Sequence, residues 1–290
     1  MHWRMHWQTS RFSIALTQPR VMGIVNVTPD SFSDGGRFVD PALAMAHCER
    51  LLHEGADMLD IGGESTRPGA ATPSPQDELA RVLPVLRHAV TLGVPVSVDT
   101  SAPEVMRAAL DLGVDIVNDV RALQRPGALA CVAAYPAAGI CLMHMRGEPG
   151  AMQSAPVYAD VVEEVAQFLQ ARCLAVQAAG ISADRIVLDP GIGFGKTSEH
   201  NLALLAGQAQ LLGLGRPLLI GWSRKSTLGA ITGRGPGERA VASAVAALLS
   251  VQRGASIVRV HDVAATVDAL KVWRAATPIA AGQSAAGEPP

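Results

Sequence analysis

The chain of 290 residues is 49% hydrophobic and 17% charged, which allows a sizeable buried core and excludes a disordered chain. Its 24 basic and 26 acidic residues give a net charge of −2 without a stripe of Lys or Arg, which argues against a nucleic-acid partner. We expect a globular, cytosolic protein, because no apolar run reaches the roughly 20 residues of a membrane span, no signal peptide is evident, and the four isolated cysteines favour buried thiols over disulfides or zinc.

Short apolar runs alternate with segments of helical period along the body of the chain. In chain order we expect a strand at 21–27, a helix at 41–53, a strand at 58–61, a helix at 76–92, a strand at 95–98, a helix at 103–112, strands at 116–118 and 140–143, a helix at 158–179, a strand at 185–188, a helix at 199–212, a strand at 217–220, a helix at 237–252, a strand at 256–260 and a helix at 263–273. Asp40-Pro41 marks a helix start, and Gly55 and Gly113 follow helix ends.

Repeated βα units of this size predict an α/β fold, a single-domain (β/α)8 TIM barrel over residues 20–276. A doubly wound open sheet is the alternative, because alternation alone does not show whether the sheet closes. Residues 1–19 and 277–290 follow neither period, so we expect a mobile N-terminal extension and a flexible C-terminal tail.

Every predicted strand ends in polar residues or in a glycine-rich loop. These ends begin at Asn26, Asp60, Asp99, Asn118, Met143, Asp189, Ser223 and Arg259. Any single Asp or Asn could instead cap the helix that follows it. Because the pattern holds at all eight strands, we predict a functional site at the carboxyl end of the barrel.

Three of these residues suit a planar, nitrogen-rich ring. The carboxylates of Asp99 and Asp189 and the amide of Asn118 can pair with the amino-pyrimidine edge of a heterocycle. The sequence therefore favours a ring-binding slot deep in the barrel.

A second set of residues suits an anion. Arg259 and His261 are two positions apart on the last strand, so they should share one face next to the glycine-rich backbone at 62–63. Arg224 and Lys225 precede a short helix, which is also a position suited to anions. Together they predict a pyrophosphate pocket at the rim.

Residues 190–197 end in Gly-Lys-Thr like a P-loop. The first glycine of that motif is replaced by Pro190, which has no backbone N–H to donate to a phosphate. We therefore do not predict an ATP site here.

Two long motifs, VNVTPDSFSDG at 25–35 and DIGGESTRPG at 60–69, resemble the signature loops of bacterial dihydropteroate synthases. Shorter matches follow at 97–100, 118–119, 188–196, 223–226 and 259–261, so that the resemblance spans about residues 21–273. Trp222 is larger than the residue expected at its position, and we interpret it as packing behind the strand.

The resemblance implies condensation of 6-hydroxymethyl-7,8-dihydropterin pyrophosphate with 4-aminobenzoate in folate synthesis, by a homodimer that uses Mg²⁺ and is a target of sulfonamides. It assigns the pterin to Asp99, Asn118, Asp189 and Lys225, with Met143 lining the slot. It assigns Mg²⁺ to Asn26, and the pyrophosphate to Thr66, Arg259 and His261. The aminobenzoate pocket is assigned to Arg67, Pro68, Phe194 and Ser226. Within this set we expect Asp99, Lys225, Arg259 and His261 to be catalytic, in a dissociative substitution without a covalent enzyme intermediate.

Two other functions are compatible with part of this pattern. A pterin- or folate-binding methyltransferase barrel would share the Asp/Asn set but would lack the Thr66-Arg67-Pro68 loop and the Arg259/His261 pair. A non-catalytic pterin-binding protein would keep the fold without the chemistry, but no expected site residue is missing from this sequence.

Overall fold

The computed structural model describes residues 6–28, 40–65, 72–147 and 156–277. Eight parallel strands form one sheet in the order β8-β7-β6-β5-β4-β3-β10-β9. Their bounds are β3 (Arg20–Asn26), β4 (Met58–Gly62), β5 (Val96–Asp99), β6 (Ile116–Asp119), β7 (Gly139–Met143), β8 (Ile186–Asp189), β9 (Leu219–Ile220) and β10 (Ile257–Val260). A single bridge between Leu188 and Leu218 joins the two edges, so the sheet is a nearly closed barrel and not an open one.

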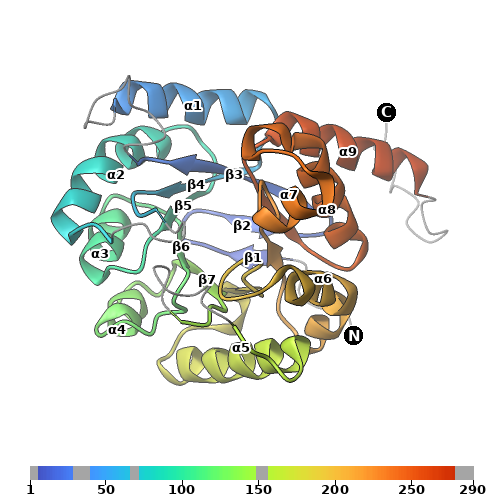
Figure 1. Cartoon of the computed structure of the whole chain (residues 1–290). Coiled ribbons are helices and arrows are strands. Elements are labelled where there is room, and N and C mark those ends of the chain that lie inside the picture. Colours follow the sequence, from blue (N-terminus) through green and yellow to red (C-terminus); the bar gives the residue numbers. More distant parts are fainter. Residues whose placement is uncertain (1–5, 29–39, 66–71, 148–155, 278–290) are drawn as a thin grey trace, which may run out of the picture.

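The helices form a ring outside this sheet (Figure 1). They are α1 (Pro41–His53), α2 (Pro75–Ala89), α3 (Pro103–Asp111), α4 (Ala128–Ala133), α5 (Val161–Ala178), α6 (Ser198–Gly207), α7 (Ser226–Thr232), α8 (Ala240–Gln252) and α9 (Val263–Ala276). Short 3-10 helices cover Ala183–Arg185, Gln208–Leu214 and Pro236–Glu238. No helix among the described residues is long and apolar enough to cross a membrane.

Two apolar layers make up the core. The larger one fills the space between the sheet and the helices and contains Trp222, which is 2% exposed and so packs as expected. The smaller one includes Met22, Met58 and Ile116, which come from three different barrel strands. This separation leaves the inner side chains further along the strands available for a polar site.

The strand register sets the level of the polar residues. Asn26 pairs with Gly62, Gly62 with Asp99, and Asp99 with Asn118 across three successive strand pairs. These residues therefore stand at one level around the barrel, at the carboxyl ends where sequence analysis places the site.

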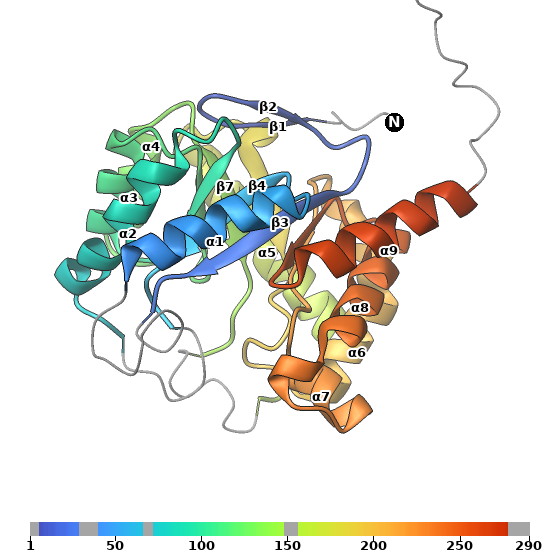
Figure 2. The same ribbon diagram turned by 90° about the horizontal axis from the view of Figure 1, so that it is seen from above.

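The N-terminal segment is not a mobile extension over its described part. Strands β1 (His6–Gln8) and β2 (Ser13–Ala15) form an antiparallel hairpin that crosses one end of the barrel, opposite the end where α7 lies (Figure 2). Trp7 is fully buried there, and its Nε1 donates to Arg185 O at 2.9 Å. Arg11 forms an ion pair with Asp115 at 2.6 Å. The expectation failed because strands of three residues are too short to show a period; the tail at 278–290 lies outside the described residues.

Candidate active site

Arg259 is the centre of a cluster of charged and polar side chains inside the barrel. Its Nε donates to Asp60 Oδ2 at 2.5 Å, and its Nη2 donates to Asp99 Oδ2 at 2.6 Å. Asn118 Nδ2 donates to the same Asp60 oxygen at 3.0 Å. Four strands thus bring the predicted anion ligand Arg259 together with two predicted ring-binding residues, Asp99 and Asn118, rather than leaving it apart at the rim.

The charges of this cluster depend on one another. Asp60 is fully buried, and its Oδ1 has no hydrogen-bond partner in the part of the chain that the structure describes. Burial raises the pKa of Asp99 to about 7, although Arg259 opposes the shift. Burial also disfavours the charge on Arg259, but attraction to Asp60 and Asp99 outweighs it and raises the arginine pKa. The cluster therefore holds a permanent cation between two carboxyl groups, with one carboxyl oxygen able to accept a ligand N–H.

Lys225 and Phe194 make a second part of the site, with a cation over an aromatic face. Lys225 Nζ lies 4.2 Å from the centre of the Phe194 ring. Burial, with Arg259 nearby, lowers the pKa of Lys225 to about 8. Phe194 also packs with Met143 and Val120 in a small apolar cluster. This apolar wall beside charged groups suits a planar ring with polar edges.

Asp189 closes this side of the site at the end of β8. Its side chain is buried, which raises its pKa, and its Oδ1 accepts from Gly191 N at 2.7 Å. Lys225 acts against that shift through its charge. The predicted ring-binding residues Asp99, Asn118 and Asp189 are thus on strand ends, and Lys225 comes five residues after β9, directly before α7.

His261 and Asn26 lie together where β10 and β3 end. Asn26 Nδ2 is 3.4 Å from His261 Nε2, and His261 Nδ1 is 3.0 Å from Ser223 Oγ. Burial and the charge of Arg259 lower the pKa of His261 to about 3, so the ring is neutral at pH 7. A neutral imidazole can donate one hydrogen bond to an anion, and the anion would in turn raise the imidazole pKa.

Other predicted residues have different surroundings. Arg224 is not placed to bind an anion, because its Nη2 and Nε donate to the two carboxyl oxygens of Asp262 at 2.6 and 3.1 Å. Ser226 is the exposed first residue of α7. The predicted loop residues Thr66, Arg67 and Pro68 lie outside the described residues.

The P-loop-like motif serves a structural purpose. Lys196 is 2% exposed, and its Nζ donates to the carbonyl oxygens of Gly191 and Phe194 at 2.9 and 3.0 Å. The same atom lies 2.9 Å from His144 Nδ1. Burial lowers the pKa of Lys196 to about 7. The lysine is therefore directed into the protein, where it holds the loop that carries Phe194.

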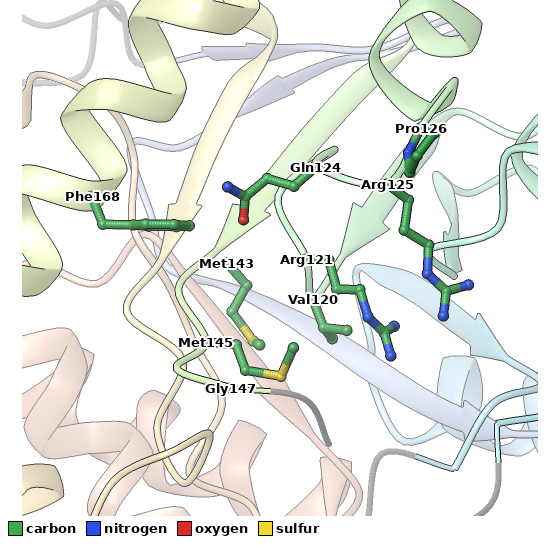
Figure 3. A pocket seen from close by; sticks show the side chains of 9 residues that line it. All are labelled: Val120, Arg121, Gln124, Arg125, Pro126, Met143, Met145, Gly147 and Phe168. Atoms are coloured by element: carbon green, nitrogen blue, oxygen red, sulfur yellow. The ribbon is translucent and has the colours of Figure 1, made fainter. Parts of the chain in front are cut away.

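A cavity of about 270 Å³ opens beside the apolar wall, near the ends of β6 and β7 (Figure 3). Its lining residues are Val120, Arg121, Gln124, Arg125, Pro126, Met143, Met145, Gly147 and Phe168. Val120 and Met143 also contact the cluster that contains Phe194. The cavity therefore adjoins the ring-binding part of the site.

Sequence analysis gave Asp60 no role, although it bonds both Arg259 and Asn118. A signal was present: Asp60 is two positions after Met58 on one strand, so both side chains face the same way. Met58 belongs to the inner apolar layer, which places Asp60 inside the barrel as well. A charged residue within a run of otherwise buried apolar and glycine residues is itself a sign of function.

The chain matches the pterin binding enzyme family over residues 22–261. It is 56% identical over 275 residues to dihydropteroate synthase of Neisseria meningitidis serogroup B, covering 93% of this chain and 96% of that relative. Among solved structures, Xanthomonas albilineans dihydropteroate synthase with 4-aminobenzoic acid is 52% identical with a TM-score of 0.86, covering 92% of this chain and 96% of that one. Burkholderia cenocepacia dihydropteroate synthase complexed with 7,8-dihydropteroate is 49% identical with a TM-score of 0.85, covering 93% and 95%.

The chain has an Asp/Asn/Lys site at the carboxyl end of its barrel, and the family matches most of its length. It therefore belongs to the family of pterin-binding enzymes. Within that family its relatives are dihydropteroate synthases, and the chain is a transferase of folate biosynthesis like them.

Proposed function

We propose that the chain joins 6-hydroxymethyl-7,8-dihydropterin pyrophosphate to 4-aminobenzoate, giving 7,8-dihydropteroate and pyrophosphate. The amino nitrogen forms a bond to the methylene carbon, the bond from that carbon to the pyrophosphate oxygen breaks, and the amine loses a proton. The observation that carries the proposal is the cluster of Asp60, Asp99, Asn118 and Arg259 beside Lys225.

The pterin ring would bind between the polar cluster and the apolar wall. Asp99 and Asp189 would accept ring N–H groups, while Asn118 offers both an acceptor and donors. Lys225, held over Phe194, would donate to a ring acceptor, and Met143 would pack on the ring face. The unpaired Oδ1 of Asp60 supports this assignment, because a buried carboxyl oxygen without a donor is unfavourable until a ligand supplies one.

The leaving pyrophosphate needs more help than the attacking amine, because an arylamine is neutral at pH 7. Arg259 uses Nε and Nη2 for Asp60 and Asp99, and its remaining N–H groups suit phosphate oxygens. With Nδ1 accepting from Ser223 Oγ, the proton of the neutral His261 ring is on Nε2, which would turn from Asn26 to donate to the same anion. These groups would stabilise the charge that develops on the departing oxygen, and the carboxylates of Asp99 and Asp189 would favour the positive charge on the dihydropterin.

Asn26 fits a role as a ligand of Mg²⁺. Its amide nitrogen faces His261 Nε2, which leaves the amide oxygen as a ligand, and Mg²⁺ is usually held by one or two protein oxygens together with substrate phosphates and water. The described residues contain no group of three or more His, Cys, Asp and Glu that could hold a metal alone. When bound, the ion would neutralise charge on the pyrophosphate.

We infer that pterin pyrophosphate binds before aminobenzoate. Aminobenzoate has one carboxylate and one ring, so it has few contacts of its own with which to bind the free enzyme. Titration calorimetry should show little heat with the free enzyme and clear binding once Mg²⁺, pyrophosphate and a pterin are present. Equally tight binding in both states would contradict the order.

We further propose a homodimer that works in the cytoplasm. Ile231 on α7 and Val241 and Val245 on α8 are 59%, 77% and 51% exposed, which supports an apolar contact surface between two copies. Four free, buried cysteines support a reducing compartment. Sedimentation should give a dimer that Val241→Asp dissociates, and a wild-type monomer would refute the proposal.

A pyrophosphate-release assay tests the reaction itself. Release from the pterin substrate should require 4-aminobenzoate, and sulfonamides, which mimic aminobenzoate, should compete with it. Asp99→Asn should lower the rate at least tenfold, because a charge-assisted hydrogen bond in a site of low polarity is worth about 1.5–3 kcal/mol. A folded Asp99→Asn protein with normal turnover would refute the ring-binding assignment.

A further inference from the structure

The turn that follows β6 has an unfavourable backbone. Ala122 and Leu123 are consecutive residues with φ of 52° and 58°, a region that residues with a Cβ rarely adopt. The Asp119 carboxylate holds this turn by accepting from the backbone N–H groups of Arg121 and Leu123 at 2.8 and 2.7 Å. Arg172 Nε donates to Ala122 O at 2.9 Å from outside. The backbone of the turn is therefore held by Asp119 and Arg172, while the side chain of Arg121 touches this network through Ser101, whose Oγ donates to Asp119 Oδ1 at 2.5 Å.

That side chain reaches across to the end of β4 instead. Arg121 Nη2 lies 3.3 Å from Glu64 Oε1, and Arg121 Nη1 lies 3.4 Å from Glu64 Oε2. Nη1 also donates to Ser101 Oγ at 2.9 Å. The two side chains of the ion pair are only 6% and 5% exposed, so the pair is shielded from water and salt. Figure 3 shows Arg121 extending away from Phe168 and Met143, so it does not line the apolar wall with its charge.

The chain at the end of β4 is also held from the side of α2. Arg81 Nη1 donates to Gly63 O at 2.9 Å. A Cβ on Gly63 would come within 2.8 Å of Val82 Cγ1 and 3.0 Å of Glu78 Cγ. The backbone at Gly63 is thus pressed against α2, while Glu64, the next residue, is anchored to the turn after β6.

We propose that Arg121 is a positioning residue of the reaction, which through Glu64 fixes the start of the β4–α2 connection against the end of β6. This inference rests on the proposed function. Asn118, on β6, belongs to the pterin side, whereas Thr66, Arg67 and Pro68 follow Glu64 within four positions in the sequence. Because Asp119 and Arg172 maintain the turn, loss of the Arg121 guanidinium should leave the pterin side in place and release Glu64.

The test is a comparison of Michaelis constants in the pyrophosphate-release assay. Arg121→Met should raise KM for 4-aminobenzoate about tenfold, the effect expected for loss of a charge-assisted contact, and change KM for the pterin substrate less than threefold. Glu64→Gln should give the same pattern, and the double variant should be no worse than either single variant. Arg121→Lys, which keeps the charge, should recover part of the loss.

Arg125→Met is the matched control, because Arg125 lines the same cavity but is not a donor to Glu64 in the described part of the chain. It should change neither constant more than threefold. Equal rises of both constants in Arg121→Met, or an unchanged KM for 4-aminobenzoate, would overturn the proposal. If Arg121→Met does not fold, Glu64→Gln decides alone, since its side chain keeps its size. An inactive wild type would refute the proposed function instead.

Discussion

Asp99 and Lys225 are two groups of the site whose charges change close to neutral pH. The pKa of Asp99 is raised to about 7 and that of Lys225 is lowered to about 8, both mainly by burial. Binding of the pterin needs Asp99 ionised and Lys225 protonated. We therefore expect kcat/KM for the pterin substrate to rise as pH passes about 7 and to fall above about 8.

Lys225→Arg separates the two limbs of this profile. Arginine stays charged throughout, so the alkaline limb should disappear while the acid limb remains, whatever the loss in absolute rate. An alkaline limb that persists unchanged in Lys225→Arg would show that another group causes it.

Glu78 is a buried carboxyl group that should reduce stability at neutral pH. It is 2% exposed, its Oε1 has no partner among the described residues, and burial raises its pKa from 4.5 to about 7. Below pH 4.5 both states are protonated and nothing is lost. Between pH 4.5 and 7 only the unfolded chain releases its proton, so stability falls, by about 3 kcal/mol in full above pH 7.

Glu78→Gln removes this ionisation and nearly keeps the shape of the side chain. We expect its melting temperature to exceed that of the wild type clearly at pH 8 and only slightly at pH 5, as measured by calorimetry. Glu104→Gln, at an exposed glutamate on α3, is the control and should show no such pH-dependent gain. A gain of equal size at both pH values would mean that packing, not ionisation, is the cause.

At the scale of elements, the β1–β2 hairpin is part of the barrel's stability. Trp7 is fully buried, packs in the inner apolar layer and donates to Arg185 O. Trp7→Ala should therefore lower the free energy of unfolding by about 3–5 kcal/mol. Trp273→Ala on α9, where the indole is half-buried, should cost less. Similar losses for both variants in urea titrations would argue against a sealing role of the hairpin.

The elements that sequence analysis predicted best are those with strong end signals. Helix α1 has the expected bounds, because Asp40 caps it through Ala42 N and Pro41 is its first residue. Helix α4 (Ala128–Ala133) was missed, since it has six residues and its N-cap, Gly127, has no side chain to act as a signal. Short elements of this kind form through tertiary contacts and carry little pattern of their own.

The same limit applies to the site. Strand ends identify Asp99 and Arg259 as polar residues on one face of the barrel. Their hydrogen bond joins residues 160 positions apart, and the pair of Arg121 and Glu64 spans 57 positions. Sequence spacing shows which level of the barrel a side chain reaches but not which partner it meets across the barrel, so these networks became visible only in three dimensions.

At the scale of the whole molecule, the two ends of the barrel differ in character. One end is closed by the hairpin, with Trp7 and the Arg11–Asp115 ion pair beneath the strands. The other carries Asp99, Arg259 and the remaining site residues. Substitutions at the first end should act on stability and those at the second on catalysis, as is general for barrels of this class.

The bridge between Leu188 and Leu218 has a consequence for how the barrel opens. The amide of Leu188 bonds to Pro217 O at 3.0 Å beside a strand of two residues, whereas the amide of Leu59 bonds to Pro95 O at 3.1 Å inside the well-paired β4–β5 region. In native-state hydrogen exchange we expect the Leu188 amide to exchange faster than the Leu59 amide, because local opening begins where few bonds join neighbouring strands.

Asp189 follows Leu188 directly, and Lys225 comes five residues after β9, so the two flanks of this seam each carry a residue of the ring-binding site. A pterin bound by Asp189 and Lys225 should slow hydrogen exchange of the Leu188 amide and leave that of the Leu59 amide unchanged. A probe of global unfolding would not detect this local effect. Equal exchange rates at the two leucines without ligand would contradict a weak seam. If the seam is weak, a bound pterin stabilises the barrel at this point. Release of the product should then make local opening between β8 and β9 easier again.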